Sequence, residues 1–140
     1  MAQSQKGTTQ GMGECGKFFA GEASTAPTII ACVTGTNTTL STGCSSAASS
    51  MVYANEIFSS ANGASMQTAT AKLSTQTDNA NDTLRLDKLF TATGAVMVLG
   101  FAAINTDKDV MYAICCYASA VTLASSDTLL NSMSIEFVCT

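Results

Sequence analysis

The sequence predicts an all-β fold, an antiparallel β-sandwich of jelly-roll or immunoglobulin-like type with an extended N-terminal arm. Turn-forming residues recur about every 10–14 residues after Gly63, a spacing typical of sandwiches and barrels. The segments between these turns are rich in apolar and β-branched residues, and no helical segments alternate with them. At 140 residues the chain is long enough for one domain. We expect an arm over residues 1–26 and a sandwich domain over residues 27–140.

The first 26 residues are polar and contain five glycines, so they have little apolar surface to bury. Phe18 and Phe19 are the exception. Two interpretations stay open for this segment: a disordered tail, or an arm that becomes ordered on a neighbouring subunit. In the second interpretation Phe18 and Phe19 are the candidate partner-binding residues.

The middle of the chain combines one clear strand pattern with weaker ones. Residues 28–34 are rich in β-branched side chains, follow Pro27 and are followed by Gly35, which predicts a strand. Residues 49–60 carry a partial apolar face and fit either a helix or a strand. Asn62-Gly63 indicates a turn, and residues 65–77 predict a strand whose two faces differ little.

The C-terminal half contains four strand patterns in succession. Residues 83–93 alternate apolar and polar side chains, which predicts one buried face with Lys88 near its rim. Residues 96–105 form a continuous apolar run, which predicts a strand covered on both faces. Gly100 within this run indicates a bulge or a close approach of another backbone. Two further strands are predicted over residues 110–121 and 128–140.

The charge pattern argues against nucleic acid and membranes as partners. Charged residues are 11% of the chain, against about 25% in typical soluble proteins, and a weakly charged surface favours association into a homo-oligomer or larger assembly. The six basic residues are scattered and the net charge is −4, so no nucleic-acid-binding patch is expected. The N-terminus is polar, and the longest apolar stretch, 95–104, is about half the length that spans a bilayer. We therefore expect synthesis in a cytoplasm, without a membrane anchor.

Residues that could support catalysis or bind a metal are missing or isolated. The chain has no histidine, which removes the usual general base and the histidine-activated nucleophiles. The glycine-rich stretch 11–16 lacks the Lys-Ser/Thr pair of a phosphate-binding loop. Asp107 and Asp109, like Asp78 and Asp82, fit turn-forming carboxylates better than calcium ligands. We expect no enzyme activity, no cofactor and no metal site.

The six cysteines do not form a zinc motif, because no pair has the required spacing. Buried apolar thiols are the favoured interpretation. Disulfides such as Cys32–Cys44 stay open as an alternative. The adjacent Cys115 and Cys116 are expected to point to opposite faces of a strand.

Three stretches of the C-terminal half share a recognisable pattern. Residues 81–94 read Asn-Asp-Thr-Leu-Arg-Leu-Asp-Lys-Leu-Phe-Thr-Ala-Thr-Gly, a polar turn followed by an alternating strand. Residues 98–105 read Val-Leu-Gly-Phe-Ala-Ala-Ile-Asn, and Ser-Asp-Thr-Leu at 126–129 precedes Ser-Ile-Glu-Phe at 134–137. Together these stretches resemble small tailed-phage virion proteins, which include head decoration or cement proteins and are often loosely labelled tail fibre proteins. The first 62 residues and the six cysteines are not part of this resemblance.

The resemblance implies a β-sandwich that binds other copies of itself or a capsid lattice. The leading hypothesis is therefore a capsid decoration (cement) protein that stabilises contacts between major capsid proteins. Its partners would be the major capsid protein and further copies of the chain. It would be made in the host cytoplasm and reside on the capsid surface of the virion. No catalytic residues are implied.

Other functions stay open at this stage. A phage tail, fibre or collar component would use the same kind of β-rich chain. A carbohydrate-binding β module would need exposed aromatic side chains, and the chain has three tyrosines and six phenylalanines but no tryptophan. A secreted domain stabilised by disulfides is a third alternative.

Overall fold

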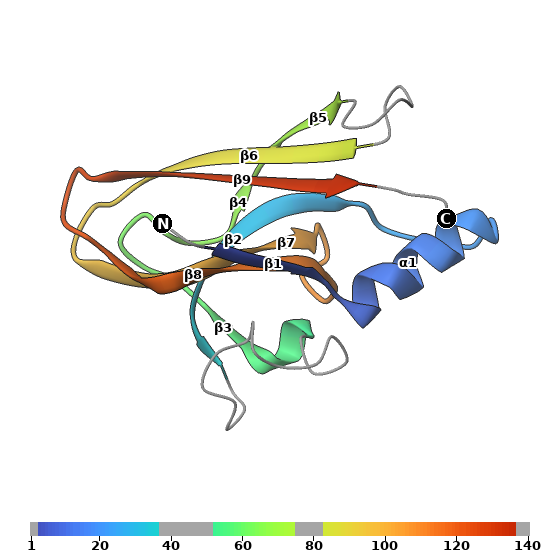
Figure 1. Cartoon of the computed structure of the whole chain (residues 1–140), viewed down its shortest axis with the longest axis horizontal. Coiled ribbons are helices and arrows are strands. Elements are labelled where there is room, and N and C mark those ends of the chain that lie inside the picture. The colour runs from blue at the N-terminus through green and yellow to red at the C-terminus, as the bar shows by residue number, and fades with distance from the viewer. Residues whose placement is uncertain (1–2, 37–51, 75–82, 137–140) are drawn as a thin grey trace.

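The computed structural model describes residues 3–36, 52–74 and 83–136. Two antiparallel sheets pack face to face, which confirms the predicted all-β sandwich (Figure 1). Sheet A has the order β1-β8-β7-β2-β3, with β4 also paired to β2, and sheet B has the order β5-β6-β9. Whether the sandwich is of jelly-roll or immunoglobulin-like type stays a prediction. In chain order the elements are β1 (Gln3–Gly7), α1 (Thr9–Phe19), β2 (Pro27–Thr36), the 3-10 helix η2 (Tyr53–Asn55), β3 (Glu56–Phe58), β4 (Gln67–Thr68), β5 (Thr70–Ser74), β6 (Thr83–Thr91), β7 (Val96–Asn105), β8 (Met111–Leu123) and β9 (Thr128–Glu136).

The C-terminal half is one long two-stranded ribbon folded across itself, here called the folded ribbon (β6 to β9). β6 pairs with β9 in sheet B, and β7 pairs with β8 in sheet A. At the fold, the Ala92 amide donates to the Asp127 carbonyl (2.8 Å) and the Ser126 amide donates to the Ala92 carbonyl (2.7 Å). These bonds carry the pairing from one sheet to the other, so the inner faces of the ribbon enclose the main core.

The main core lies between the two sheets and is filled by large side chains from both. Each fully buried Leu, Ile, Phe or Met contributes roughly 1.5–3 kcal/mol by leaving water. One face of β6 is buried, as predicted: Leu86 and Phe90 point into the core, whereas Arg85 and Leu89 are exposed on the other face. Lys88 is only partly exposed. Core members from four strands are Ile30, Leu86, Phe90, Phe101 and Met133.

Sheet A is covered on both faces, as the apolar run in β7 predicted. Its inner face joins the main core, and its outer face carries a second cluster that includes Ile104 and Ile114. Tyr53 and Phe58 stack over this cluster with ring centroids 5.2 Å apart. A two-sided strand has no polar face, which explains why its sequence does not alternate.

Gly100 has both of the features that its sequence context indicated. The register of β7 on β8 shifts next to it, since Val98 lies opposite Val121 and Gly100 lies opposite Cys116. A Cβ atom at position 100 would lie 2.3 Å from the Cys115 carbonyl oxygen. Only glycine allows the two backbones to approach so closely.

The N-terminal segment is not an extended arm, so that expectation is wrong. β1 pairs antiparallel with β8, which makes it part of sheet A, and α1 packs beside the same strand. The boundary predicted after residue 26 therefore does not separate an arm from the sandwich. Glycines at three positions lower the helix propensity of α1, and tertiary contacts described below overcome this cost.

Residues 49–60 and 65–77 form short elements rather than one long element each. In the first range the described part contains η2 and β3, so the helix alternative is wrong beyond Met51, and the strand alternative is confirmed only for Glu56–Phe58. The second range contains β4, paired to β2 in sheet A, and then β5, paired to β6 in sheet B. The chain thus passes from one sheet to the other at Ala69. Residues 75–77 lie outside the described residues.

The cysteines among the described residues include buried thiols and one disulfide-bonded residue. Cys32 is a buried free thiol, so the suggested Cys32–Cys44 pairing is wrong, while Cys116 is disulfide-bonded. Burial raises the pKa of the Cys32 thiol to about 12, although a hydrogen bond from the Asn131 side chain (3.6 Å) opposes this shift. The side-chain oxygen of Asn131 in turn accepts a hydrogen bond from the Tyr117 hydroxyl (2.5 Å). This polar chain crosses the core between β8, β9 and β2 with its hydrogen bonds made.

Candidate interaction surface at helix α1

Helix α1 has well-defined ends. The Thr8 side chain caps its start by accepting a hydrogen bond from the Gly11 amide (3.1 Å). At its end Gly21 adopts φ +74°, the Gly21 amide donates to the Phe18 carbonyl (3.1 Å) and the Glu22 amide donates to the Lys17 carbonyl (2.9 Å). This pattern is a Schellman motif with glycine in the left-handed position. Both ends therefore satisfy backbone groups that a helix otherwise leaves unpaired.

The start of α1 is fixed to the β7–β8 hairpin. The Thr8 amide donates to the Tyr112 carbonyl (3.0 Å), and the Thr8 hydroxyl donates to the Met111 carbonyl. The Gln10 side-chain oxygen accepts from the amides of Met111 (3.2 Å) and Tyr53 (2.9 Å), which ties η2 to the same place. A Cβ atom on Gly11 would lie 2.6 Å from Tyr112 Cα, so helix and strand touch through their backbones.

A second set of bonds fixes the middle of α1 to the linker that follows it. Lys17 Nζ lies 2.6 Å from Glu14 Oε1, and the other oxygen of Glu14 accepts from the Thr25 amide (3.3 Å). The bond with Lys17 is the main cause that lowers the pKa of Glu14. The Tyr112 hydroxyl donates to the Thr25 carbonyl, and burial raises the pKa of Tyr112 to about 12. The middle of the helix is therefore bonded to the linker, and the linker is bonded to β8.

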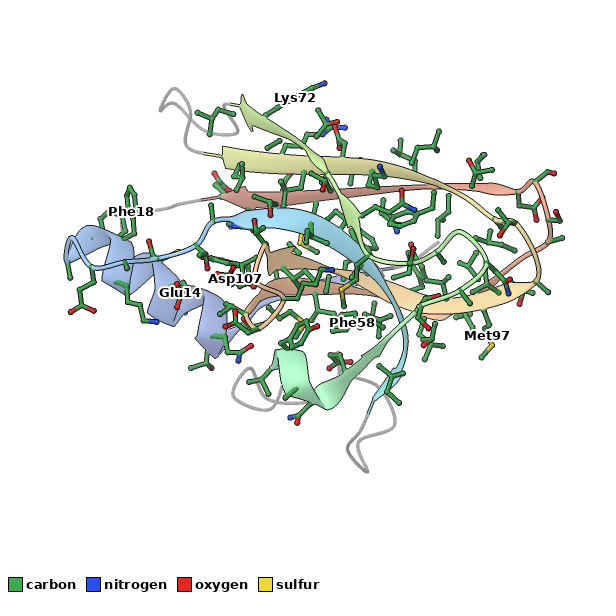
Figure 2. All side chains as sticks on the ribbon, turned by 180° about the vertical axis from the view of Figure 1, so that it is seen from behind. Glu14, Phe18, Phe58, Lys72, Met97 and Asp107 are labelled. Atoms are coloured by element: carbon green, nitrogen blue, oxygen red, sulfur yellow. The ribbon has the colours of Figure 1, made fainter. Side chains whose placement is uncertain are left out.

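Phe18 and Phe19 stand at the C-terminal end of this fixed helix. They are 70% and 81% exposed, and their rings meet edge to face with centroids 5.8 Å apart. Figure 2 shows Phe18 on the side of α1 that faces the end of β9. The structure thus places the two predicted partner-binding residues together on the surface, on a helix rather than on an extended arm.

Beside the two rings lies a hollow that we call the α1 groove, about 400 Å³ in volume. Phe18, Phe19 and Cys15 line it from the helix, Leu84 and Ile135 line it from the ends of β6 and β9, and Tyr112 of β8 lines it as well. Its walls are almost entirely apolar. Because Leu84 and Ile135 face each other in the register of sheet B, the groove continues from the edge of the main core.

Carboxylates lie near the helix side of the groove, and Glu14 is one of the residues that line it. Glu14, Glu22 and Asp109 each raise the pKa of Lys17, and the largest cause is the hydrogen bond that Lys17 donates to Glu14. We call these three carboxylates the acidic rim. Among the described side chains, Lys17 is bonded to one of these three carboxylates, so the acidic rim together with Lys17 has a net negative charge. Glu14 and Asp107 lie at the same end of the molecule (Figure 2).

One buried carboxyl lies away from this surface. Glu56 in β3 is 6% exposed, its Oε2 atom has no hydrogen-bond partner, and burial raises its pKa to about 7. In the β7–β8 turn, the carboxylate of Asp109 accepts a hydrogen bond from the Asn105 side chain (2.7 Å), as expected for a turn residue.

Among the described residues, no group of three or more histidine, cysteine, aspartate or glutamate side chains could hold a metal ion. None of the helices in these ranges is long and apolar enough to cross a membrane.

Comparisons with known proteins were made at three levels. A scan against protein-family models, a search of curated proteins and a search of solved structures each return no match. The interpretation of this surface therefore depends on the chain's own residues.

Several residues that shape the surface were not anticipated from the sequence. The signals were present: Thr8 is a favourable N-cap, Lys17 lies in the last turn, and Gly21 follows the helix end. Glycines inside the helix outweighed them in the sequence-based prediction. Leu84 and Ile135 lie in segments that were predicted as strands, but nothing in the sequence indicates that α1 lies beside them.

Proposed function

We propose that this chain is a virion structural protein, a capsid decoration (cement) protein that binds the outer capsid and stabilises contacts between major capsid proteins. The observation that carries the proposal is the rigid display of Phe18 and Phe19. Two adjacent phenylalanines more than two-thirds exposed, next to an apolar groove, are typical of a surface that a protein partner covers. Hydrogen bonds at both ends of α1 fix the helix that carries the rings before any partner binds, which lowers the entropy lost on binding.

The rest of the molecule supports such a role. Sheet A is packed on both faces, and the low number of charged residues favours association with other protein surfaces. The contact offered by α1 is small compared with a stable two-protein interface, which buries about 1,200–2,000 Å². A decoration protein tolerates a small contact, because many copies on one shell bind neighbouring sites and the weak contacts act together.

A carbohydrate-binding function fits the groove less well. Sugar sites need polar side chains that bond to hydroxyl groups. In the α1 groove the Tyr112 hydroxyl already donates to the Thr25 carbonyl, and the other walls are mainly apolar. A tail, fibre or collar component would use the same surface, and only its place in the particle distinguishes it from a cement protein.

The test is the presence of the chain in purified virions of the genome that encodes it. We expect mass spectrometry to find the wild-type chain in particles, and cryo-electron microscopy to place it on the capsid. The double variant Phe18→Ser/Phe19→Ser should fold, as circular dichroism would check, but should be depleted from particles. The matched control is Met12→Ser, which changes a side chain that is 75% exposed on the same helix but outside the groove.

Two results would contradict the proposal. The first is absence of the wild-type chain from particles, and the second is full retention of the double variant. Density on the tail instead of the head would favour the tail, fibre or collar alternative. Point variants are preferred to a deletion of residues 1–20, because that deletion would also remove β1 from sheet A.

A further inference from the structure

We propose that the α1 groove receives a basic amphipathic segment of a partner protein. An aromatic or aliphatic side chain of this segment would fill the groove, and flanking lysines or arginines would contact the acidic rim. The inference deepens the proposed function and rests on it for one point, the identity of the partner as a capsid protein. The chemistry of the segment follows from the groove itself.

The apolar part of the argument comes from the walls of the groove. Phe18 and Phe19 on one side and Leu84 and Ile135 on the other leave a space of about 400 Å³. This is near the lower limit of small-molecule pockets, roughly 300–1,000 Å³. An inserted aromatic ring would stack edge to face on rings that already adopt this geometry. Such a filled, water-free pocket is where binding energy concentrates at protein interfaces.

The charged part of the argument comes from the acidic rim. Glu14 is bonded to Lys17, and no ion pair within the described ranges involves Glu22 or Asp109. A partner with like charge would be repelled, whereas lysine or arginine next to the inserted side chain would gain favourable contacts at the rim of the interface. The charge of the groove therefore selects among apolar segments.

Two other occupants match this charge less well. A second copy of the chain would have to supply basic residues, but it has only six, and two of them, Lys17 and Arg85, are in ion pairs. A lipid surface that carries anionic headgroups would be repelled by the acidic rim. A basic protein segment satisfies both the apolar walls and the charge.

The experiment measures binding of fluorescent peptides to the purified full-length chain by anisotropy. The basic probe is Lys-Lys-Leu-Phe-Lys-Leu-Phe-Lys-Lys, and its matched acidic probe has glutamate in place of every lysine. We expect the basic probe to bind at least about tenfold more tightly than the acidic probe, and the difference to shrink as salt is added. Vesicles of phosphatidylcholine, with and without phosphatidylglycerol, serve as the lipid arm and should not bind.

Paired variants separate the two parts of the groove. Phe18→Ser/Phe19→Ser should weaken binding of the basic probe by about tenfold or more, and Met12→Ser should not. Glu22→Gln should weaken it by about two- to threefold. The control Ser125→Lys makes the same change in net charge on the exposed β8–β9 turn, at the opposite end of the molecule from α1, and should leave binding unchanged (Figure 1).

Equal binding of the basic and acidic probes would overturn the inference, as would tighter binding to vesicles than to the peptide. An equal effect of Glu22→Gln and Ser125→Lys would also overturn it, because it would show that only net charge matters. These outcomes are independent of the virion test. Absence from particles would remove the proposed function and leave the peptide selectivity intact, while presence on particles without peptide selectivity would remove only this inference.

Discussion

The folded ribbon, β6 to β9, differs from the N-terminal half, β1 to β5 with α1, in what holds each part in the sandwich. The ribbon is held by two long ladders of backbone bonds and by large side chains in the main core. In the N-terminal half, β2 is held in the same way, but α1 and β3 lie outside this core. α1 is attached through individual polar groups and one close backbone contact at Gly11. The difference predicts that the two parts respond to different kinds of substitution.

The largest expected effect is on the core of the ribbon. Phe90→Ala removes a ring that is 1% exposed between the sheets, and we expect it to lower the free energy of unfolding by about 3–5 kcal/mol. The matched control is Leu89→Ala, the preceding residue on the same strand, whose side chain is 56% exposed on the outer face. It should change stability by less than about 1 kcal/mol. Urea denaturation measures both, and similar losses would contradict the assigned faces of β6.

A smaller effect on stability, opposite in sign for two glycines of the same helix, tests how α1 is attached to β8. Gly11→Ala places a Cβ atom against the backbone of Tyr112, so we expect a loss of about 1–3 kcal/mol. A Cβ at Gly13 meets nothing within 4 Å, so Gly13→Ala should stabilise the helix by about 0.5–1 kcal/mol. Thermal denaturation measures the pair. Stabilisation by both substitutions would show that α1 does not touch β8.

The smallest of these effects is a pH dependence in β3. Because burial raises the pKa of Glu56 to about 7 from 4.5, the folded state holds this proton more tightly than the unfolded state. Stability is therefore greatest below about pH 4.5 for this group and falls as the pH rises through 7. Glu56→Gln should leave stability unchanged at pH 4 and raise it by about 1–2 kcal/mol at pH 8.

The control for the pH dependence is Glu22→Gln, which removes a carboxylate exposed to solvent. We expect it to change stability by no more than about 0.5 kcal/mol. Urea midpoints of the wild type and both variants at the two pH values give the comparison. A wild-type chain that gains stability relative to Glu56→Gln as the pH rises would contradict the burial of this carboxyl.

The two parts of the molecule also differ in how far the sequence predicts them. Alternation in β6 and the unbroken apolar run in β7 indicated which faces are buried, because strand faces follow directly from the order of side chains. The N-terminal strand Gln-Ser-Gln-Lys-Gly has no such order, and its place beside β8 depends on residues more than 100 positions away. Helix α1 contains glycines that weaken any helix prediction, although Thr8 and Gly21 mark its ends.

Of the candidate site, the sequence predicted two residues, Phe18 and Phe19, but not the geometry around them. Phe18 and Phe19 stood out because the first 26 residues contain little else to bury. The groove beside them requires Leu84 and Ile135 from distant strands, and this proximity arises only when α1 is docked. The acidic rim likewise combines the helix, its following linker and the β7–β8 turn. Local sequence patterns carry no information about such combinations.

The central claim is that residues 3–26 fold onto their own chain and display Phe18 and Phe19 on a fixed helix. Amide hydrogen exchange of the full-length protein tests this claim most directly. We expect the amides from Met12 to Ala20, whose bonds run back along the helix, to exchange at least about tenfold more slowly than in an unstructured chain. Exchange of these amides at the unstructured rate, while those of β7 and β8 stay protected, would show that the segment is a free arm.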